Sequence, residues 1–416
     1  MKDSMLHEIT ITTFTYGGDA MGRLPDPLTG TGNRAVFVPF GLPGERVRVR
    51  LVEDKKNFAR GEIVEILEPS QDRIDAKCIH FGECGGCHYQ NLPYEKQTRA
   101  KTDILIDQLK RIGKIENPPV VPMVACPNPW NYRNHVQFHL SEAGKVGYIR
   151  ARGEGVLEIS ECHLPEPSID RLWPQLEFEP ETDIVRVSLR NGADEDVMLV
   201  LESETPETPE LEIEAGISIT HVFDENTVVL AGSEHILMRV LGRDFKVSAS
   251  SFFQVNTVMA GKMVEHLLAR VPVSPSTVLL DVYCGVGLFS AFLAPKCGRV
   301  IGVEASESSC EDFTVNLDEF DNVELYEGEA EEVIPHLEAK PDIVLVDPPR
   351  AGLDKAVMDG ILKLNPSLIA YVSCDPSTLA RDAARLINGG YTLKEVTPFD
   401  LFPQTYHIES ISIFER

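Results

Sequence analysis

The chain has 416 residues and a mass of 46.2 kDa, more than one hydrophobic core ordinarily supports, so two or three domains are expected. Hydrophobic residues make up 43% of it and charged residues 25%, which excludes wholesale disorder and collagen-like repeats. The formal net charge of −26 argues against a polyanionic partner, because nucleic acids are usually held by Lys and Arg.

The acidity is confined to one part of the chain. Residues 1–150 hold 20 basic and 18 acidic side chains, whereas the remaining residues hold 19 and 47, so the two parts carry net charges of +2 and −28. The N-terminal part is locally basic at two places, namely Arg46, Arg48 and Arg50, and then Lys55, Lys56 and Arg60. This asymmetry indicates that the N-terminal module faces a polyanion.

The sequence favours a cytoplasmic protein. No apolar run reaches the roughly 18 residues that span a bilayer, and residues 1–5 lack the apolar core of a signal peptide. Nine cysteines without a secretory signal indicate a reducing compartment, in which cysteines are more often ligands or nucleophiles than disulfides.

The N-terminal 66 residues predict a small β-barrel of about five strands. Strand patterns separated by turn signals cover residues 9–12, 35–39, 47–52 and 61–67. Five-stranded barrels of the OB type commonly bind oligonucleotides on one face. The pattern alone leaves open whether this barrel binds RNA or serves only for docking.

The middle of the chain predicts a loop, a helix and then strands. A cysteine-rich loop covers 78–87, a polar helix covers 94–112, and a strand-rich region ends near residue 245. The acidic stretch 177–214, punctuated by prolines, is expected to be a solvated surface elaboration. The predicted domains are a barrel over 1–66, a central domain over 67–245 and a third domain over 246–416.

The third domain predicts an α/β fold, because apolar strands alternate with helices from residue 277 onward. Strands are expected at 278–283, 300–304, 323–326, 343–347, 368–373, 391–397 and 407–414. Helices are expected at 307–320 and 377–387, among others. The last two strands are joined by a tight loop and not by a helix, so one of them is expected to run antiparallel.

The first strand of this domain runs into a glycine-containing turn that suits a cofactor. Gly285 and Gly287 allow the backbone to approach a ligand at the carboxyl end of the strand. Ser290 occupies the third position of a dinucleotide-binding glycine motif, and no phosphate-gripping GK[ST] motif is present. A cofactor without a pyrophosphate is therefore favoured.

Acidic residues follow at the ends of the next strands. Glu304 ends the second strand, at the usual place for a carboxylate that accepts from ribose hydroxyls. Glu329 follows the third strand, and Asp347 ends the fourth before two prolines. This succession resembles the Rossmann-like, seven-stranded fold of the S-adenosylmethionine-dependent methyltransferases.

A nucleophile and a base are predicted near the C-terminus. Cys374 lies at the carboxyl end of the fifth strand, where the start of the following helix is expected to lower the pKa of its thiol. Glu409 lies on the final strand, which in a sheet of this type is the neighbour of the fifth, so it is expected to face the same pocket. An exposed strand glutamate and a buried structural cysteine are the alternatives.

Four sequence motifs resemble the RNA uracil-C5 methyltransferase family. They are SFFQVN from residue 251, DPPRAG from 347, SCDPSTLARD from 373 and HIE from 407. The resemblance implies that the cysteine matching Cys374 adds to uracil C6, that C5 then accepts the methyl group of S-adenosylmethionine, and that the carboxylate matching Glu409 removes the C5 proton. By the same resemblance the cofactor contacts are Gln254, Tyr283, Glu304, Glu329 and Asp347.

The cysteine-rich loop predicts a metal centre. Cys78, Cys84 and Cys87 are followed far downstream by Cys162, and four unevenly spaced cysteines suit a [4Fe-4S] cluster better than zinc, although zinc stays open. The loop resembles that of the family's ribosomal-RNA branch, which implies a cluster with a structural role. The N-terminal barrel resembles the TRAM domain found ahead of many members of the family. The other four cysteines are expected to be ordinary core or surface residues.

The resulting hypothesis is a monomeric enzyme that methylates C5 of a uridine in structured RNA, with large-subunit ribosomal RNA as the first choice and the T-loop uridine of tRNA as the second. Two other classes stay open: a non-catalytic RNA-binding protein that has kept the fold, and an enzyme of the same fold that methylates an exocyclic base amine. The second class typically has an aromatic residue where this chain has Arg350, and needs no nucleophilic cysteine.

Overall fold

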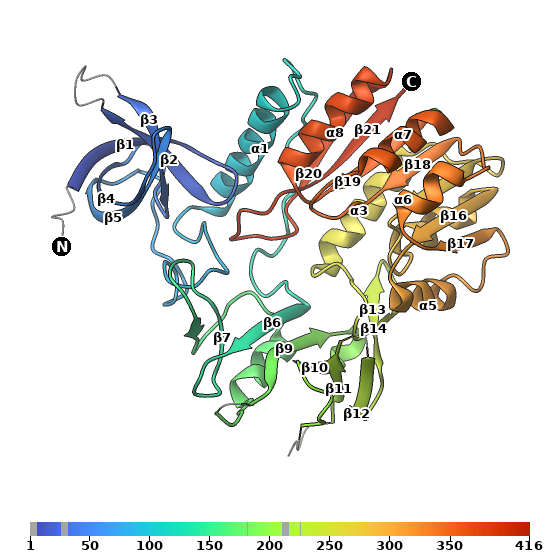
Figure 1. Ribbon diagram of the computed structural model, residues 1–416, viewed down its shortest axis with the longest axis horizontal. Helices are drawn as coiled ribbons and strands as arrows, with labels where there is room; N and C mark the ends of the chain where they lie inside the picture. The colour runs from blue at the N-terminus through green and yellow to red at the C-terminus, as the bar shows by residue number, and fades with distance from the viewer. Residues whose placement is uncertain (1–5, 26–31, 181, 210–215, 225) are drawn as a thin grey trace. The chain divides into compact units, whose positions relative to one another are not determined.

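The computed structural model describes residues 6–25, 32–180, 182–209, 216–224 and 226–416, and the chain forms two compact units (Figure 1). The first unit consists of 1–105, 148–157 and 402–407, and the second of 106–147, 158–401 and 408–416. The predicted three-part division of the chain stays a prediction. Residues 1–5, on which the leader-sequence argument rests, lie outside the described residues.

The first unit contains the predicted barrel. Its described strands are β1 (Leu6–Phe14), β2 (Asp19–Pro25), β3 (Gly32–Pro39), β4 (Arg46–Asp54) and β5 (Phe58–Glu68). They close in the order β1-β2-β3-β5-β4 around a core of alternating apolar side chains such as Ile11, Val36 and Val49. The sequence pattern located four of these strands and missed β2. The sequence of β2, DAMGRLP, contains glycine, methionine and charged residues and lacks the alternating β-branched residues typical of a strand.

The segment 402–407 joins the first unit although it lies close to the end of the chain. The carbonyl of Gln404 accepts from the backbone N–H groups of His88 and Tyr89 at 2.8 and 3.0 Å. The Gln97 side chain donates to Oε1 of Gln404 at 2.9 Å. These buried bonds fix the chain just before the strand that begins at Glu409.

The second unit begins within helix α1 (Tyr94–Arg111) and contains a central sheet. Its strands follow the order β12-β11-β10-β9-β6, and the strand β7 pairs with β6. The bounds are β6 (His135–Leu140), β7 (Val146–Ile149), β8 (Val156–Glu158), β9 (Ile184–Asn191), β10 (Val197–Ser203), β11 (Ser218–Phe223) and β12 (Asn226–Ala231). A hairpin of β13 (His235–Val240) and β14 (Arg243–Ser248) follows.

The expectation of a solvated elaboration over 177–214 is wrong for its middle part. Strands β9 and β10 lie inside the central sheet, where Val187, Leu189 and Leu201 are fully buried, and helix α2 (Pro167–Leu172) contacts β9. Nearly all acidic residues of this stretch lie outside the two strands, so the average charge concealed two largely buried strands. Residues 181 and 210–215 lie outside the described residues.

The C-terminal part of the second unit is the predicted α/β domain. Among the described residues its sheet has seven strands in the order β17-β16-β15-β18-β19-β21-β20. They are β15 (Val278–Val282), β16 (Arg299–Glu304), β17 (Val323–Glu327), β18 (Ile343–Val346), β19 (Leu368–Ser373), β20 (Thr392–Phe399) and β21 (Glu409–Glu415). The strand β21 runs antiparallel to both of its neighbours, which confirms that expectation.

Helices cover this sheet because its central strands are apolar on both faces, β15, β18 and β19 being buried along nearly their whole length. The helices are α3 (Thr257–Arg270), α4 (Leu288–Leu293), α5 (Glu307–Asn316), α6 (Ala330–Val333), α7 (Lys355–Leu364) and α8 (Pro376–Asn388). Polar side chains cap several of them, as where Asn256 accepts from the N–H of Met259. No helix in the described ranges is long and apolar enough to cross a membrane.

Candidate active site

The predicted site residues gather at one edge of the C-terminal sheet. Strands β15 to β19 are parallel, so their carboxyl ends meet at the same edge. That edge carries, in the order of the strands along the chain, Tyr283, Glu304, Glu329, Asp347 and Cys374.

Glu409 reaches this edge from the opposite direction. It is the first residue of β21, which pairs antiparallel with β19 in a register that sets Ser410 opposite Ser373. Cys374 and Glu409 are therefore the next residues on the two neighbouring strands. The Glu409 side chain is 7% exposed, so the alternative of an exposed strand glutamate does not hold.

The turn after β15 leaves room for a ligand. Gly285 and Gly287 have φ angles of 53° and 89°, in the left-handed region that favours glycine, and Tyr283 shares it at 64°. A methyl group on Gly285 would meet nothing within 4 Å, whereas one on Gly287 would lie 2.3 Å from the Leu317 side chain. The turn is thus tightly packed at Gly287 and has free space beside Gly285.

Glu304 is held in place beside this turn. One of its carboxylate oxygens accepts from the N–H of Gly285, and the other accepts from the N–H groups of Ala305 and Ser306, each at 2.9 Å. A carboxylate has about four acceptor positions, so capacity remains for hydroxyl donors of a ligand.

Two carboxyl groups, the buried Asp281 and the partly buried Asp347, lie at the ends of neighbouring strands. Burial is the main cause that raises the pKa of each from 3.8 to about 7, and at Asp281 the neighbouring Asp347 and Glu304 contribute to this rise. Ser290 donates to one oxygen of Asp281 at 2.6 Å, while the other, Oδ1, is buried without a hydrogen-bond partner among the described residues. An acidic, partly unsatisfied edge with an open backbone turn fits a cationic nucleoside cofactor such as S-adenosylmethionine.

Gln254 is tied to the same edge. It lies just before helix α3, and the side chain of Asn256 donates to the carbonyl of Leu401 at 3.2 Å. Leu401 follows β20, whose last residue, Phe399, is the register partner of Glu409. The segment that carries Gln254 therefore lies near the end of the strand that carries the predicted base.

The structure contradicts the expected low pKa of Cys374. The pKa of its thiol is raised from 9.0 to about 12, mainly by burial and also by the carboxylates of Glu409 and Asp347, while Arg350 acts in the opposite direction. The start of helix α8 does not offset these effects, because its first N–H groups, from Ser377 and Thr378, already donate to the Asp375 carboxylate.

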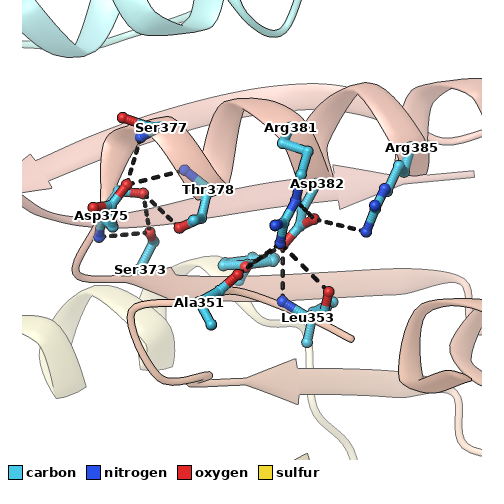
Figure 2. A network of polar contacts seen from close by, with 10 residues as sticks. Ala351, Leu353, Ser373, Asp375, Ser377, Thr378, Arg381, Asp382 and Arg385 are labelled. Carbon is cyan, nitrogen blue, oxygen red and sulfur yellow. Dashed lines mark hydrogen bonds and ion pairs between the residues drawn. The ribbon is translucent and has the colours of Figure 1, made fainter. Parts of the chain in front are cut away.

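A buried carboxylate connects α8 to the loop that follows β18 (Figure 2). Asp382 is fully buried and accepts from Arg381, from the N–H of Leu353 at 2.8 Å and from the Tyr371 hydroxyl at 2.9 Å. Arg381 also donates to the carbonyl of Ala351 at 2.8 Å. The network therefore fixes the loop after Asp347 against the helix that follows Cys374.

The basic surface expected on the barrel is largely neutralised. Arg46 pairs with Glu8 and Glu68 at 3.2 and 2.7 Å, and Arg48 pairs with Glu8 at 3.1 Å and also with Glu65. The neighbouring strands supply these carboxylates in register, which the arginine count alone could not reveal. The local group of Arg46 and Arg48 is therefore weaker support for a nucleic-acid surface than the sequence suggested.

Three of the four predicted cluster cysteines, Cys78, Cys84 and Cys87, lie in the first unit and Cys162 lies in the second. The N–H of Gly86 donates to the sulfur of Cys84 at 3.3 Å, a type of contact that iron–sulfur sites use. The loop turns tightly at Gly85, where a methyl group would lie 2.8 Å from the carbonyl of Ile149. The thiol groups are of the donor type that a cluster requires, but no group of three or more His, Cys, Asp or Glu in the described ranges is arranged to hold a metal ion, so the cluster stays a prediction.

Sequence reasoning assigned no role to Asp281, Tyr371 or Asp382. An aspartate within an apolar strand and another within a buried helix face were visible as exceptions to the hydrophobic pattern. Apart from Arg381, which is adjacent to Asp382 on α8, their hydrogen-bond partners come from other elements, so no local signal identified what they bind.

Two parts of the chain match known protein families. Residues 234–416 match the family described as tRNA (Uracil-5-)-methyltransferase, and residues 7–64 match the TRAM domain. The chain is 33% identical to an uncharacterized RNA methyltransferase from Thermosynechococcus vestitus over 98% of this chain and 97% of that one. It is 34% identical to another from Aquifex aeolicus over 100% and 99% of the two chains.

A solved structure has the same fold. The tRNA (uracil-54, C5)-methyltransferase of Pyrococcus abyssi, in complex with S-adenosyl-L-homocysteine, superposes with a TM-score of 0.75 and 24% sequence identity. The similarity covers 98% of this chain and all of that one.

Proposed function

The chain belongs to the RNA (uracil-5-)-methyltransferase family and is an S-adenosylmethionine-dependent enzyme of that family. From this premise we propose that it methylates C5 of one uridine in structured RNA, with Cys374 as nucleophile and Glu409 as base. The observation that carries the proposal is the pairing of β19 with β21, which makes the two residues neighbours at the edge with the open turn. A non-catalytic RNA-binding protein would have no need of this pairing of a half-buried thiol with a buried carboxylate.

Cys374 is the proposed nucleophile. Its sulfur forms a bond to C6 of uracil, and the electron pair of the C5–C6 double bond moves to make C5 nucleophilic. The high pKa of the buried thiol means that the thiolate must be stabilised locally. Arg350 is the cation whose charge lowers this pKa, so we assign it to that task.

Glu409 is the proposed base. After C5 has gained the methyl group, the carboxylate removes the C5 proton, the C5–C6 double bond re-forms and the bond between C6 and the Cys374 sulfur breaks. A base flipped out of the RNA is required, because the two side chains and the methyl donor must reach the same ring.

The residues proposed to hold S-adenosylmethionine are Gln254, Tyr283, Glu304, Glu329 and Asp347. When bound, the cofactor supplies an electrophilic methyl group on a positively charged sulfur. Glu304 is oriented for ribose hydroxyls by its three backbone bonds, and Asp347 contributes an acidic group at the edge next to Cys374. Glu329 is exposed at the start of α6, which suits a contact at the rim of the site.

Two variants test the chemistry. Cys374→Ala is expected to abolish methyl transfer to RNA, and Glu409→Gln is expected to accumulate a covalent protein–RNA adduct that migrates slowly on a denaturing gel. Cys297→Ala removes a buried thiol outside the site and serves as the matched control. Full methylation by the Cys374 variant would refute the assignment.

The target RNA is proposed to be large-subunit ribosomal RNA, because the cysteine-rich loop resembles the family's ribosomal-RNA branch. The tRNA T-loop is the second candidate, since the family description and the Pyrococcus abyssi structure both refer to tRNA. Mapping 5-methyluridine in both RNAs from a strain that lacks this protein distinguishes the two candidates.

We further propose that Cys78, Cys84, Cys87 and Cys162 bind a [4Fe-4S] cluster with a structural role. The N–H group of Gly86 directed at the Cys84 sulfur supports this assignment. Protein purified without oxygen is expected to be brown and to contain about four iron atoms and four sulfides per chain. Colourless protein with stoichiometric zinc would refute the cluster.

The remaining proposals concern organisation. The TRAM domain over 7–64 is proposed to bind RNA, and the enzyme is proposed to act as a cytoplasmic monomer of three domains, 1–66, 67–245 and 246–416. Light scattering of the purified protein, with and without RNA, tests the oligomeric state.

A further inference from the structure

A cavity of mixed polar and apolar lining lies in the second unit, on one face of the central sheet. Its volume is about 240 Å³, below that of sites for drug-sized ligands. The residues that line it come from strands β6, β9, β10 and β11 and from the segment 249–253.

The floor of the cavity is a row of cross-strand neighbours. Ser188 on β9 pairs with Gln137 on β6 and with Val200 on β10, so the three side chains share one face of the sheet. Arg190, two residues further along β9, donates to the carbonyls of Ser248 and Ser251 at 2.9 and 3.0 Å. These two bonds hold the segment 249–253 over the floor.

Ser188 carries an unsatisfied hydroxyl. The residue is 3% exposed and its Oγ has no hydrogen-bond partner among the described residues. Thr220, on the same face of β11, is fully buried and its hydroxyl is likewise without a partner in the described ranges. Buried hydroxyl groups are normally hydrogen-bonded, so the Ser188 hydroxyl at the cavity has capacity for a bond to a polar ligand, whereas Thr220 does not line the cavity.

Phe252 lines the cavity, and most of its side chain is exposed to solvent. It is 67% exposed, whereas its neighbour Phe253 is 5% exposed and packs beside Phe245. Exposed aromatic rings next to polar groups are typical platforms for nucleobases, whose faces stack on them.

The charges at the cavity suit a base and not a phosphate. Arg190 directs its guanidinium at backbone carbonyls, and Glu202 places a carboxylate at the wall. Burial lowers the pKa of His135 to about 3, so its imidazole is neutral at physiological pH. A phosphate would meet a carboxylate and no available cation among these three residues, whereas a neutral base would meet hydrogen-bonding groups.

The cavity is also connected to the catalytic edge. The side chain of Asn134 donates to the carbonyl of Gln254 at 3.0 Å, and its backbone N–H donates to the carbonyl of Val255 at 2.9 Å. Asn134 immediately precedes β6, whose first residue, His135, lines the cavity. The covering segment thus runs directly from Phe252 to the proposed cofactor contact at Gln254.

From these observations we propose that this cavity binds one unstacked RNA base that flanks the target uridine, with the base stacked on Phe252 and hydrogen-bonded to Ser188 and Gln137. The proposal rests on the proposed function, which supplies the RNA. It assigns to the central sheet and to the segment 249–253 a part in choosing the uridine, through the identity and position of a neighbouring nucleotide.

Synthetic RNA hairpins with single abasic nucleotides test the proposal. Hairpins of the tRNA T-arm and of a large-subunit ribosomal RNA loop are prepared with the base removed, one at a time, at the three positions on either side of the loop uridine. Affinity is measured for the full chain and for Phe252→Ala, Ser188→Ala and Val258→Ala. The last removes an exposed apolar side chain outside the cavity and is the matched control.

The wild-type chain is expected to lose affinity by roughly 5- to 150-fold at one abasic position, the range found for stacking of a single base. Phe252→Ala is expected to lose a similar factor on intact RNA and to show no further loss at that position, while Val258→Ala behaves as the wild type. Equal losses for wild type and Phe252→Ala at every abasic position would overturn the proposal.

Methyl transfer and S-adenosylhomocysteine binding, measured on the same samples, separate the two levels of inference. If the wild-type chain does not methylate the RNA, but Phe252→Ala shows no further affinity loss at one abasic position, the proposed function is overturned and the proposed base-binding cavity is supported. Normal methylation without such coupling would overturn the cavity alone. Ser188→Ala should weaken RNA binding without changing S-adenosylhomocysteine affinity, and an unchanged RNA affinity would exclude the hydroxyl as a contact.

Discussion

The network around Asp382 makes a quantitative prediction for the variant Asp382→Asn. The carboxylate is fully buried and accepts from the Tyr371 hydroxyl at 2.9 Å, from the N–H of Leu353 at 2.8 Å and from Nε of Arg381 at 2.9 Å. An asparagine keeps one acceptor oxygen and directs an NH₂ group at the donors on the other side. At least one N–H or O–H group that now donates to the carboxylate would then face the NH₂ group of the asparagine, and neither of these two buried donors would have an acceptor.

The expected loss of stability follows from these contacts. Each buried donor left without an acceptor costs about 1–3 kcal/mol, and hydrogen bonds to a charged acceptor lie at the upper end of the range. Arg381 is 39% exposed at its side chain, so water recovers part of its share. The net decrease in the free energy of unfolding is therefore expected to be about 3–5 kcal/mol.

Urea denaturation followed by circular dichroism measures this decrease. Asp359→Asn is the matched control, because Asp359 pairs with Lys355 on the exposed surface of α7 and should cost less than about 0.5 kcal/mol. Tyr371→Phe removes one donor and should cost about 1 kcal/mol. A decrease below about 1 kcal/mol for Asp382→Asn would show that the carboxylate is not the centre of the network.

Four further outcomes are expected. Gly352→Ala should destabilise the chain by roughly 2–4 kcal/mol, because φ is +74° and the added methyl would lie 2.5 Å from an Asp382 oxygen; an unchanged urea midpoint would contradict this. Ser188→Ala should leave the free energy of unfolding within about 0.5 kcal/mol of the wild type, since its hydroxyl has no partner in the described ranges, and a larger loss would assign it a structural bond. The rate at which iodoacetamide alkylates Cys374 should keep rising beyond pH 10, because a thiol pKa of about 12 leaves roughly a thousandfold less thiolate than the ordinary pKa of 9.0. Peptide mass spectrometry measures this rate, and a plateau near pH 9 would disprove the raised pKa. Stability should decrease as the pH rises from about 4 to 7, because folded Asp347, with a pKa of about 7, holds a proton that the unfolded chain releases near 3.8, and Asp347→Asn should flatten this part of the pH profile.

The sequence by itself determined the C-terminal fold and the position of each site residue along it. Apolar strands alternating with helices admit few arrangements other than a parallel sheet, and such a sheet collects its strand ends at one edge. Glu304, Asp347 and Cys374 could be assigned to that edge because each directly follows or ends an apolar strand. This assignment depends only on where apolar strands end, which can be read from a single sequence.

Only the tertiary structure decided the electrostatics and the packing. The pKa of Cys374 rises because burial and carboxylates from other strands surround it, and the arginines of β4 are neutralised by glutamates of β1 and β5. The cavity beside Ser188 arises where β6, β9 and β10 lie next to the segment 249–253, which is distant from all three in the sequence. Interactions of this kind depend on which distant residues meet in space, and periodicity and composition carry no information about that.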